Sequence, residues 1–110
     1  TKFPIYRDGT CIGLLTTGGV MKWMAEHITN NLIDLTDIKV SDVFPYERNH
    51  LIDFVDQHKN IFDVEELFEK NHANNKKLEA VVITENGNRN EKPLGIITSW
   101  DLIEIDNFVQ

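Results

Sequence analysis

The chain has 110 residues, of which 41% are hydrophobic and 26% are charged. These proportions suit one compact globular domain and argue against an intrinsically disordered chain. The formal net charge is −7, and the densest basic spot is the pair Lys76-Lys77. Because a negative surface repels a phosphate backbone, we expect no nucleic-acid partner.

The sequence carries no signal for secretion or for a membrane. A single cysteine, Cys11, cannot form a disulfide within the chain, and we expect it to be a small buried core residue. No apolar run approaches the ~20 residues of a membrane helix, and no signal peptide is visible. These features predict a cytoplasmic protein without membrane association. Since the chain opens on strand-like residues without a Met, we expect it to be a piece of a longer one.

The N-terminal part predicts a hairpin followed by a helix. Residues 3–7 and 11–15 are apolar enough for two strands, and Asp8-Gly9 between them is typical of a hairpin turn. Thr16 or Thr17 can cap a helix over about 18–28. Its apolar stripe consists of Val20, Trp23, Met24 and Ile28. Residues 29–37 lose this periodicity and predict a connector.

The remainder predicts alternating strands and helices. One helical turn near Val40 should end at Pro45. Asn60, with Asp63 three residues later, is typical of a helix start. The predicted elements are a strand over 50–55, a helix over 61–71, strands over 78–84 and 93–98, and a closing helix over 99–106. We therefore predict the α/β (α+β) fold class.

Two stretches repeat one pattern when they are aligned on their glycines. The first is IGLLTTGGV (12–20) and the second is LGIITSWDL (94–102). In each, an apolar pair follows the glycine, and a threonine then ends the strand and caps the next helix. Thr98 and Asp101 should project near each other at a strand's carboxyl end, a common place for ligands in open α/β sheets. Asp101 could equally serve only the helix N-terminus.

The repeated stretch resembles the closing signature of a CBS motif. The helix stretch NIFDVEELF (60–68) is similar to the first helix of that motif. The resemblance implies a CBS-type βαββα motif over about 37–110. Residues 1–36 would then hold the β-β-α end of a second copy and the connector. The implied architecture is a CBS domain pair (Bateman module), pseudo-twofold packed, whose missing first strand and helix would precede Thr1.

The resemblance also implies a ligand, because CBS pairs commonly bind adenosine nucleotides such as AMP, ADP or ATP between their motifs. The family's ribose-binding Ser/Thr and Asp correspond here to Thr98 and Asp101, with no catalytic or metal-binding residues. Two neighbouring basic residues, Arg48 and His50, are candidates for phosphate contacts. The candidate purine walls are Ile96, Ile52 and Leu78.

The first copy departs from the pattern, because Gly19 stands where the second copy has Asp101. We therefore expect the first copy to lack the ribose carboxylate, and the chain to have at most one good nucleotide site. The incomplete first copy should expose apolar surface, which predicts a homodimer.

Three classes of function follow. The leading one is a regulatory, ligand-sensing module without a cofactor, and the alternative is a ligand-free dimerisation or interaction domain. An enzyme is disfavoured, because no nucleophile has a base at a useful spacing and no phosphate-binding glycine loop is present.

Overall fold

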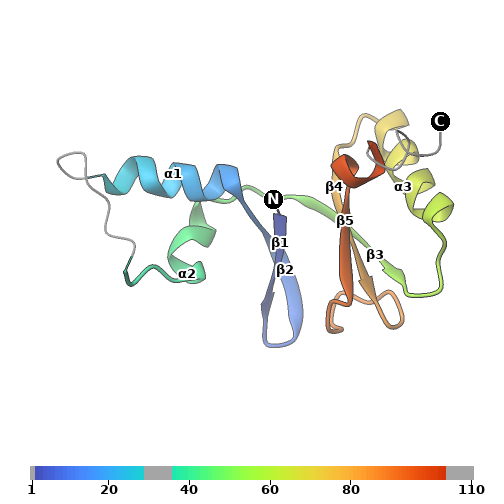
Figure 1. The fold of residues 1–110 in the computed structure, drawn as a ribbon, viewed down its shortest axis with the longest axis horizontal. Coiled ribbons are helices and arrows are strands. Elements are labelled where there is room, and N and C mark those ends of the chain that lie inside the picture. Colours follow the sequence, from blue (N-terminus) through green and yellow to red (C-terminus); the bar gives the residue numbers. More distant parts are fainter. Residues whose placement is uncertain (1, 29–35, 104–110) are drawn as a thin grey trace.

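The computed structural model describes residues 2–28 and 36–103, and it has a mixed α/β fold. A two-stranded hairpin lies between α1 and α2 on one side and a three-stranded sheet on the other, with α3 at the far end (Figure 1). The elements are β1 (Lys2–Arg7), β2 (Thr10–Thr16), α1 (Thr17–His27), α2 (Val40–Val43), η1 (Phe44–Tyr46), β3 (Leu51–Asp56), α3 (Ile61–Ala73), β4 (Leu78–Thr84) and β5 (Gly95–Thr98). Both the predicted α/β class and the predicted order of elements are confirmed.

Local signals account for the helix starts. Thr16 caps α1, since its hydroxyl accepts a hydrogen bond from the Gly19 N–H at 3.1 Å. Asn60 and Asp63 form a reciprocal capping box at the start of α3. Residues 99–103 form the start of the closing helix, while the rest of its predicted span lies outside the described residues, as do residues 29–35 of the connector.

The predicted helical turn near Val40 is confirmed as α2, but Pro45 does not end the helical path, which continues to Tyr46. The chain continues from α2 into the short 3₁₀ helix η1, and Pro45 lies inside it. Proline is tolerated there because the first residues of a helix have no internal partner for their N–H groups.

The C-terminal part forms one β-α-β-β unit. β3 pairs with β4 in parallel, and β5 pairs with the other edge of β4 in the antiparallel sense. The parallel pair is connected by α3, as such a pair requires. The apolar layer on the α3 side of the sheet is built around Val55, Val64, Leu78 and Val81.

The hairpin β1-β2 has the same register as the hairpin β4-β5. In the first, Gly13 lies opposite Ile5 and Leu15 opposite Phe3. In the second, Gly95 lies opposite Ile83 and Ile97 opposite Val81. The glycine-based alignment of the two stretches therefore holds residue by residue in space, and Phe3 occupies the position that corresponds to Val81.

The two hairpins share one core. Cys11 and Leu14 of β2 pack with Ile52, Ala80 and Val82 of the three-stranded sheet, and all five side chains are buried. Cys11 is thus a core residue, as its sequence context predicted. The hairpin is also held by Arg89, whose carbonyl accepts a hydrogen bond from the Cys11 N–H and whose guanidinium donates one to the Cys11 carbonyl, each at 3.0 Å. The first hairpin is consequently docked on the three-stranded sheet through β2.

Candidate functional site

The corner of the second repeat brings Thr98 and Asp101 together. The N–H and the hydroxyl of Thr98 both donate to Oδ2 of Asp101, at 2.8 and 3.1 Å. Asp101 is exposed, and neither residue lines any of the cavities described below. The geometry is that of a helix-capping pair, and ribose binding by these two residues stays a prediction.

The corner of the first repeat has the same geometry with a different carboxylate. The N–H of Thr16 donates to Oε2 of Glu47 at 2.5 Å, and its hydroxyl donates to Oε1 at 2.8 Å. A Cβ atom at Gly19 would overlap the Glu47 carboxylate. Glu47 therefore provides a carboxylate at the corner where Gly19 has no side chain, while the expectation that the first copy lacks a ribose-binding carboxylate stays a prediction.

Sequence reasoning did not single out Glu47, and no local signal could have done so. The residue follows η1 and lies 31 positions from Thr16 in the chain. Its place depends on how the segment before β3 passes across the start of α1. The one available hint was the glycine itself, since a repeat that loses its carboxylate leaves the threonine without an acceptor.

Glu47 belongs to a buried ionic network that joins the two repeats. Nε2 of His50 lies 3.1 Å from Oε1 of Glu47, and Nδ1 of His50 contacts Oε2 of Glu79. The side chains of all three are at most 4% exposed. Each ring nitrogen of His50 therefore faces a carboxylate oxygen. Arg48 adds a hydrogen bond to Oε1 of Glu79 at 2.7 Å.

The network keeps Glu47 ionised. Burial acts to raise the pKa of its carboxyl, but the hydrogen bonds from Thr16 and His50 outweigh burial and hold the pKa below its usual value of 4.5. A fixed negative charge therefore sits at the corner of the first repeat at neutral pH.

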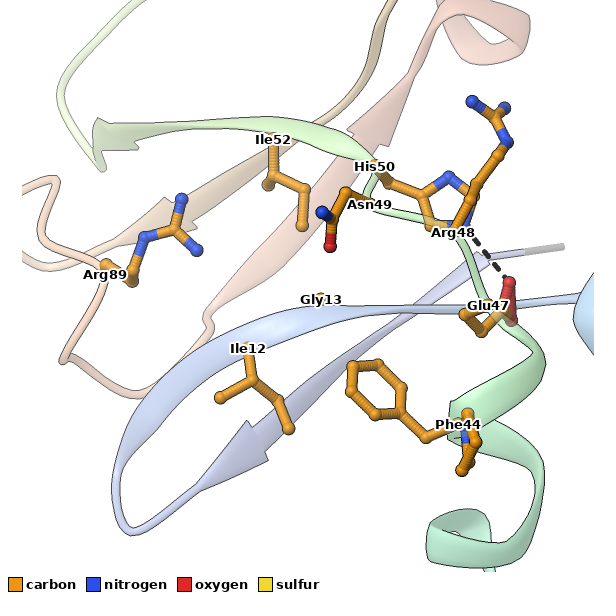
Figure 2. Close-up of a pocket in the computed structure, with 10 residues that line it drawn as sticks. Ile12, Gly13, Phe44, Glu47, Arg48, Asn49, His50, Ile52 and Arg89 are labelled. Carbon is orange, nitrogen blue, oxygen red and sulfur yellow. Dashed lines mark hydrogen bonds and ion pairs between the residues drawn. The ribbon is translucent and has the colours of Figure 1, made fainter.

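A cavity of about 240 Å³ lies between β2 and the segment that leads into β3 (Figure 2). Three of the predicted ligand residues, Arg48, His50 and Ile52, line it. Gly13 leaves room for the Phe44 ring, since a Cβ at position 13 would come within 3.0 Å of that ring. The other lining residues are Ile12, Pro45, Glu47, Asn49 and Arg89.

The remaining predicted purine walls lie elsewhere. Leu78 is 5% exposed and belongs to the apolar layer under α3. Ile96 packs on the core that the two hairpins share. Neither side chain lines the cavity beside Gly13, because β4 and β5 present them to packed layers of the sheet instead.

These observations define a mixed α/β module with a repeated strand-to-helix corner and a cavity between the repeats. Comparison with known families gives the class a name, since a model described as CBS domain matches residues 40–107. The chain belongs to the CBS domain family, whose domains are typically regulatory modules. The match covers one CBS domain, so the assignment of residues 1–36 to a second motif stays a prediction. No curated protein and no solved structure gave a match.

Two further findings concern the described residues only. None of their helices has the length and apolar character needed to cross a bilayer. None of their His, Cys, Asp and Glu side chains gathers in a group of three or more that could hold a metal ion.

Proposed function

We propose that this chain is a regulatory module that senses an adenosine nucleotide in the cavity between β2 and the segment 44–52. The observation that carries the proposal is the placement of this cavity. It is bounded on one side by Ile12 and Gly13 of the first repeat and on the other by Arg48, His50 and Ile52 of the second. A ligand bound there would contact both repeats at once. Adenosine nucleotides are the ligands that the CBS resemblance implies.

The chemistry of the walls suits a flat base with a polar attachment. Ile12, Ile52 and the Phe44 ring provide apolar surface, and aromatic rings stack well on planar groups. Arg48, whose side chain is 57% exposed, can reach an anion at the cavity mouth. A ligand regulates only if it binds one state more tightly than another. Contact with both repeats lets it favour the docked arrangement of hairpin and sheet.

Isothermal titration calorimetry with adenosine, AMP, ADP and ATP tests the proposal. We expect at least one nucleotide to bind with a dissociation constant below on the order of 1 mM. The variant Ile12→Trp fills the cavity without adding charge, and it should weaken binding at least about tenfold. Met21→Trp is the matched control, because Met21 is exposed on α1 and does not line the cavity.

A second variant separates the two candidate positions for the ligand. Asp101→Ala removes the carboxylate of the second corner; a ligand confined to the cavity beside Gly13 should still bind, whereas a ligand whose ribose is held by Thr98 and Asp101 should not. Loss of binding in Asp101→Ala with retention in Ile12→Trp would move the ligand to the Thr98–Asp101 corner. Absence of heat with all four ligands would overturn the nucleotide proposal and leave the interaction-domain alternative.

That alternative, a homodimerisation domain, is favoured by one specific observation. Phe3 corresponds in register to Val81, yet it is 57% exposed, whereas Val81 is fully buried under α3. An apolar hollow of about 160 Å³ lies beside it, lined by Phe3, Leu15, Thr16, Thr17 and Val20. We propose that a second copy of the chain covers this face, because a position that packs a helix in one repeat is exposed in the other.

Multi-angle light scattering over a concentration series tests the dimer. We expect a dimer whose dissociation constant rises at least about tenfold in Phe3→Ser. Phe62→Ser is the control, since Phe62 is 75% exposed on α3 and has no counterpart in the hollow. A monomer at every concentration, or equal weakening by both variants, would rule out this interface.

A further inference from the structure

A second cavity, of about 260 Å³, lies at the start of α1 and is lined by four cationic side chains. They come from separate parts of the chain: Lys2 from β1, Lys22 from α1, Arg48 from the segment before β3, and Lys77 from the turn before β4. The chain has only 11 Lys and Arg residues and a net charge of −7. More than a third of its cations therefore face one small cavity.

Two carboxylates, Glu47 and Glu79, also border this cavity, but both already have partners. Glu47 accepts hydrogen bonds from Thr16 and contacts His50. Glu79 contacts His50 and Arg48, and Nζ of Lys2 lies 4.0 Å from its Oε1. Lys2 and Arg48 therefore offset part of the negative charge of the network, and the cavity's remaining positive charge is that of Lys22 and Lys77.

Lys22 and Lys77 are different. Both are exposed, and neither side chain makes a hydrogen bond or ion pair within residues 2–28 and 36–103. Their ammonium groups are available to a ligand from solution. Between them the wall is formed by Gly18 and Gly19, and the first turn of α1 carries no acidic side chain. The Glu47 carboxylate packs against Gly19, but its side chain is only 3% exposed and already contacts Thr16 and His50, so the unpaired charges that an anion meets from solution are those of Lys22 and Lys77.

The two cavities adjoin, because Glu47, Arg48 and His50 line both. Each is smaller than the roughly 300–1,000 Å³ typical of ligand pockets. A ligand with its base beside Gly13 would direct its other end past Arg48 toward Lys22 and Lys77. The cationic cavity has room for more than one phosphoryl group.

We propose that the cavity lined by Lys2, Lys22, Arg48 and Lys77 binds a phosphate chain, so that the module prefers a nucleoside triphosphate to a monophosphate. The preference between nucleotides rests on the proposed nucleotide function. The anion site itself does not, because a phosphate chain without a nucleoside can occupy it.

Calorimetry with inorganic tripolyphosphate, adenosine, AMP and ATP tests the two parts separately. The double variant Lys22→Ala/Lys77→Ala should weaken binding of tripolyphosphate and of ATP at least about tenfold, because charge-assisted contacts are lost. Adenosine binding should be unchanged, and the ratio of ATP to AMP affinity should fall toward one. Lys70→Ala/Lys92→Ala is the matched control, with the same change in net charge at exposed sites away from the cavity.

The outcomes distinguish this inference from the nucleotide proposal. Binding of tripolyphosphate without binding of adenosine, AMP or ATP would refute the nucleotide function and retain the anion site. Adenosine and ATP binding with equal affinity, unaffected by the lysine variants, would refute the anion site alone. Equal weakening of tripolyphosphate binding in both double variants would show a general effect of charge and also overturn the inference.

Discussion

Replacing Gly19 with aspartate is expected to lower the free energy of unfolding by more than about 3 kcal/mol, because the new side chain would overlap a buried carboxylate and add a like charge beside it. The variant Glu47→Ala should lower the free energy of unfolding by about 2 kcal/mol or more, since it leaves the Thr16 N–H and Nε2 of His50 without their partner. Urea denaturation followed by circular dichroism measures both losses.

The informative result is the double variant Gly19→Asp/Glu47→Ala. The introduced aspartate could then accept from Thr16 as Asp101 accepts from Thr98, and Glu47 would no longer obstruct it. We expect the double variant to be more stable than Gly19→Asp alone, with a coupling energy of about 2 kcal/mol. Gly18→Asp is the control, because Gly18 is exposed and a Cβ atom added there would lie 3.6 Å from its nearest neighbour. Simple additivity of the two changes would contradict the equivalence of Glu47 and Asp101.

The second large effect is expected at Glu79, where removal of the carboxylate should lower the free energy of unfolding by about 3–5 kcal/mol. Glu79→Ala deprives His50 of a buried partner and leaves that ring facing Glu47 alone. It also removes the ion-pair partner of Arg48. Because the Arg48 side chain is more exposed, water can solvate it, and this part of the change costs less free energy. Thermal and urea unfolding of Glu79→Ala against the unmodified chain measure the loss.

Two variants make the result specific. Glu85→Ala removes an exposed carboxylate just after β4 and should change stability by less than about 0.5 kcal/mol. Glu79→Gln preserves the shape of the side chain, so its loss of unfolding free energy should lie between those of Glu79→Ala and Glu85→Ala. If Glu79→Ala were as stable as Glu85→Ala, the network would not join the repeats energetically.

The network and the two cavities occupy the same region, and this has a consequence for regulation. Glu47 holds the first repeat to the second through Thr16, and Arg48 and His50 connect it to Glu79. Glu47, Arg48 and His50 also line both proposed binding surfaces. A phosphate chain near Arg48 would compete with Glu79 for that guanidinium. Ligand binding and the docking of the two repeats are therefore expected to be coupled through shared side chains.

Much of the fold could be predicted from the sequence, because its signals are local. The alternation of apolar residues, the Asp8-Gly9 turn and the Asn60 cap each act within a few residues of the backbone they shape. The repeat was visible for the same reason, since the glycine-to-threonine stretches carry one pattern at two places. The match of their hairpin registers shows that the pattern describes one piece of structure formed twice.

The candidate site was predictable only in part. Arg48, His50 and Ile52 were found because they precede or begin a strand in the motif, and they do line the cavity. Leu78 and Ile96 were chosen by the same reasoning, but packing under α3 and against the hairpin places them in the core. Whether a strand residue lines the cavity or joins the core depends on which element packs against its face of the strand.

By itself, then, the sequence determined the elements, their order, the repeat and the CBS-type class, because backbone hydrogen bonding and side-chain period are set over short distances. Only the tertiary structure decided that Glu47 serves the corner that Gly19 leaves open, and that His50 lies between two buried carboxylates. The contacts of Glu47 with Thr16 and of His50 with Glu79 join residues about thirty positions apart. The first contact exists only once the hairpin has docked on the sheet, and the second only once β3 has paired with β4, so no spacing along the chain encodes either directly.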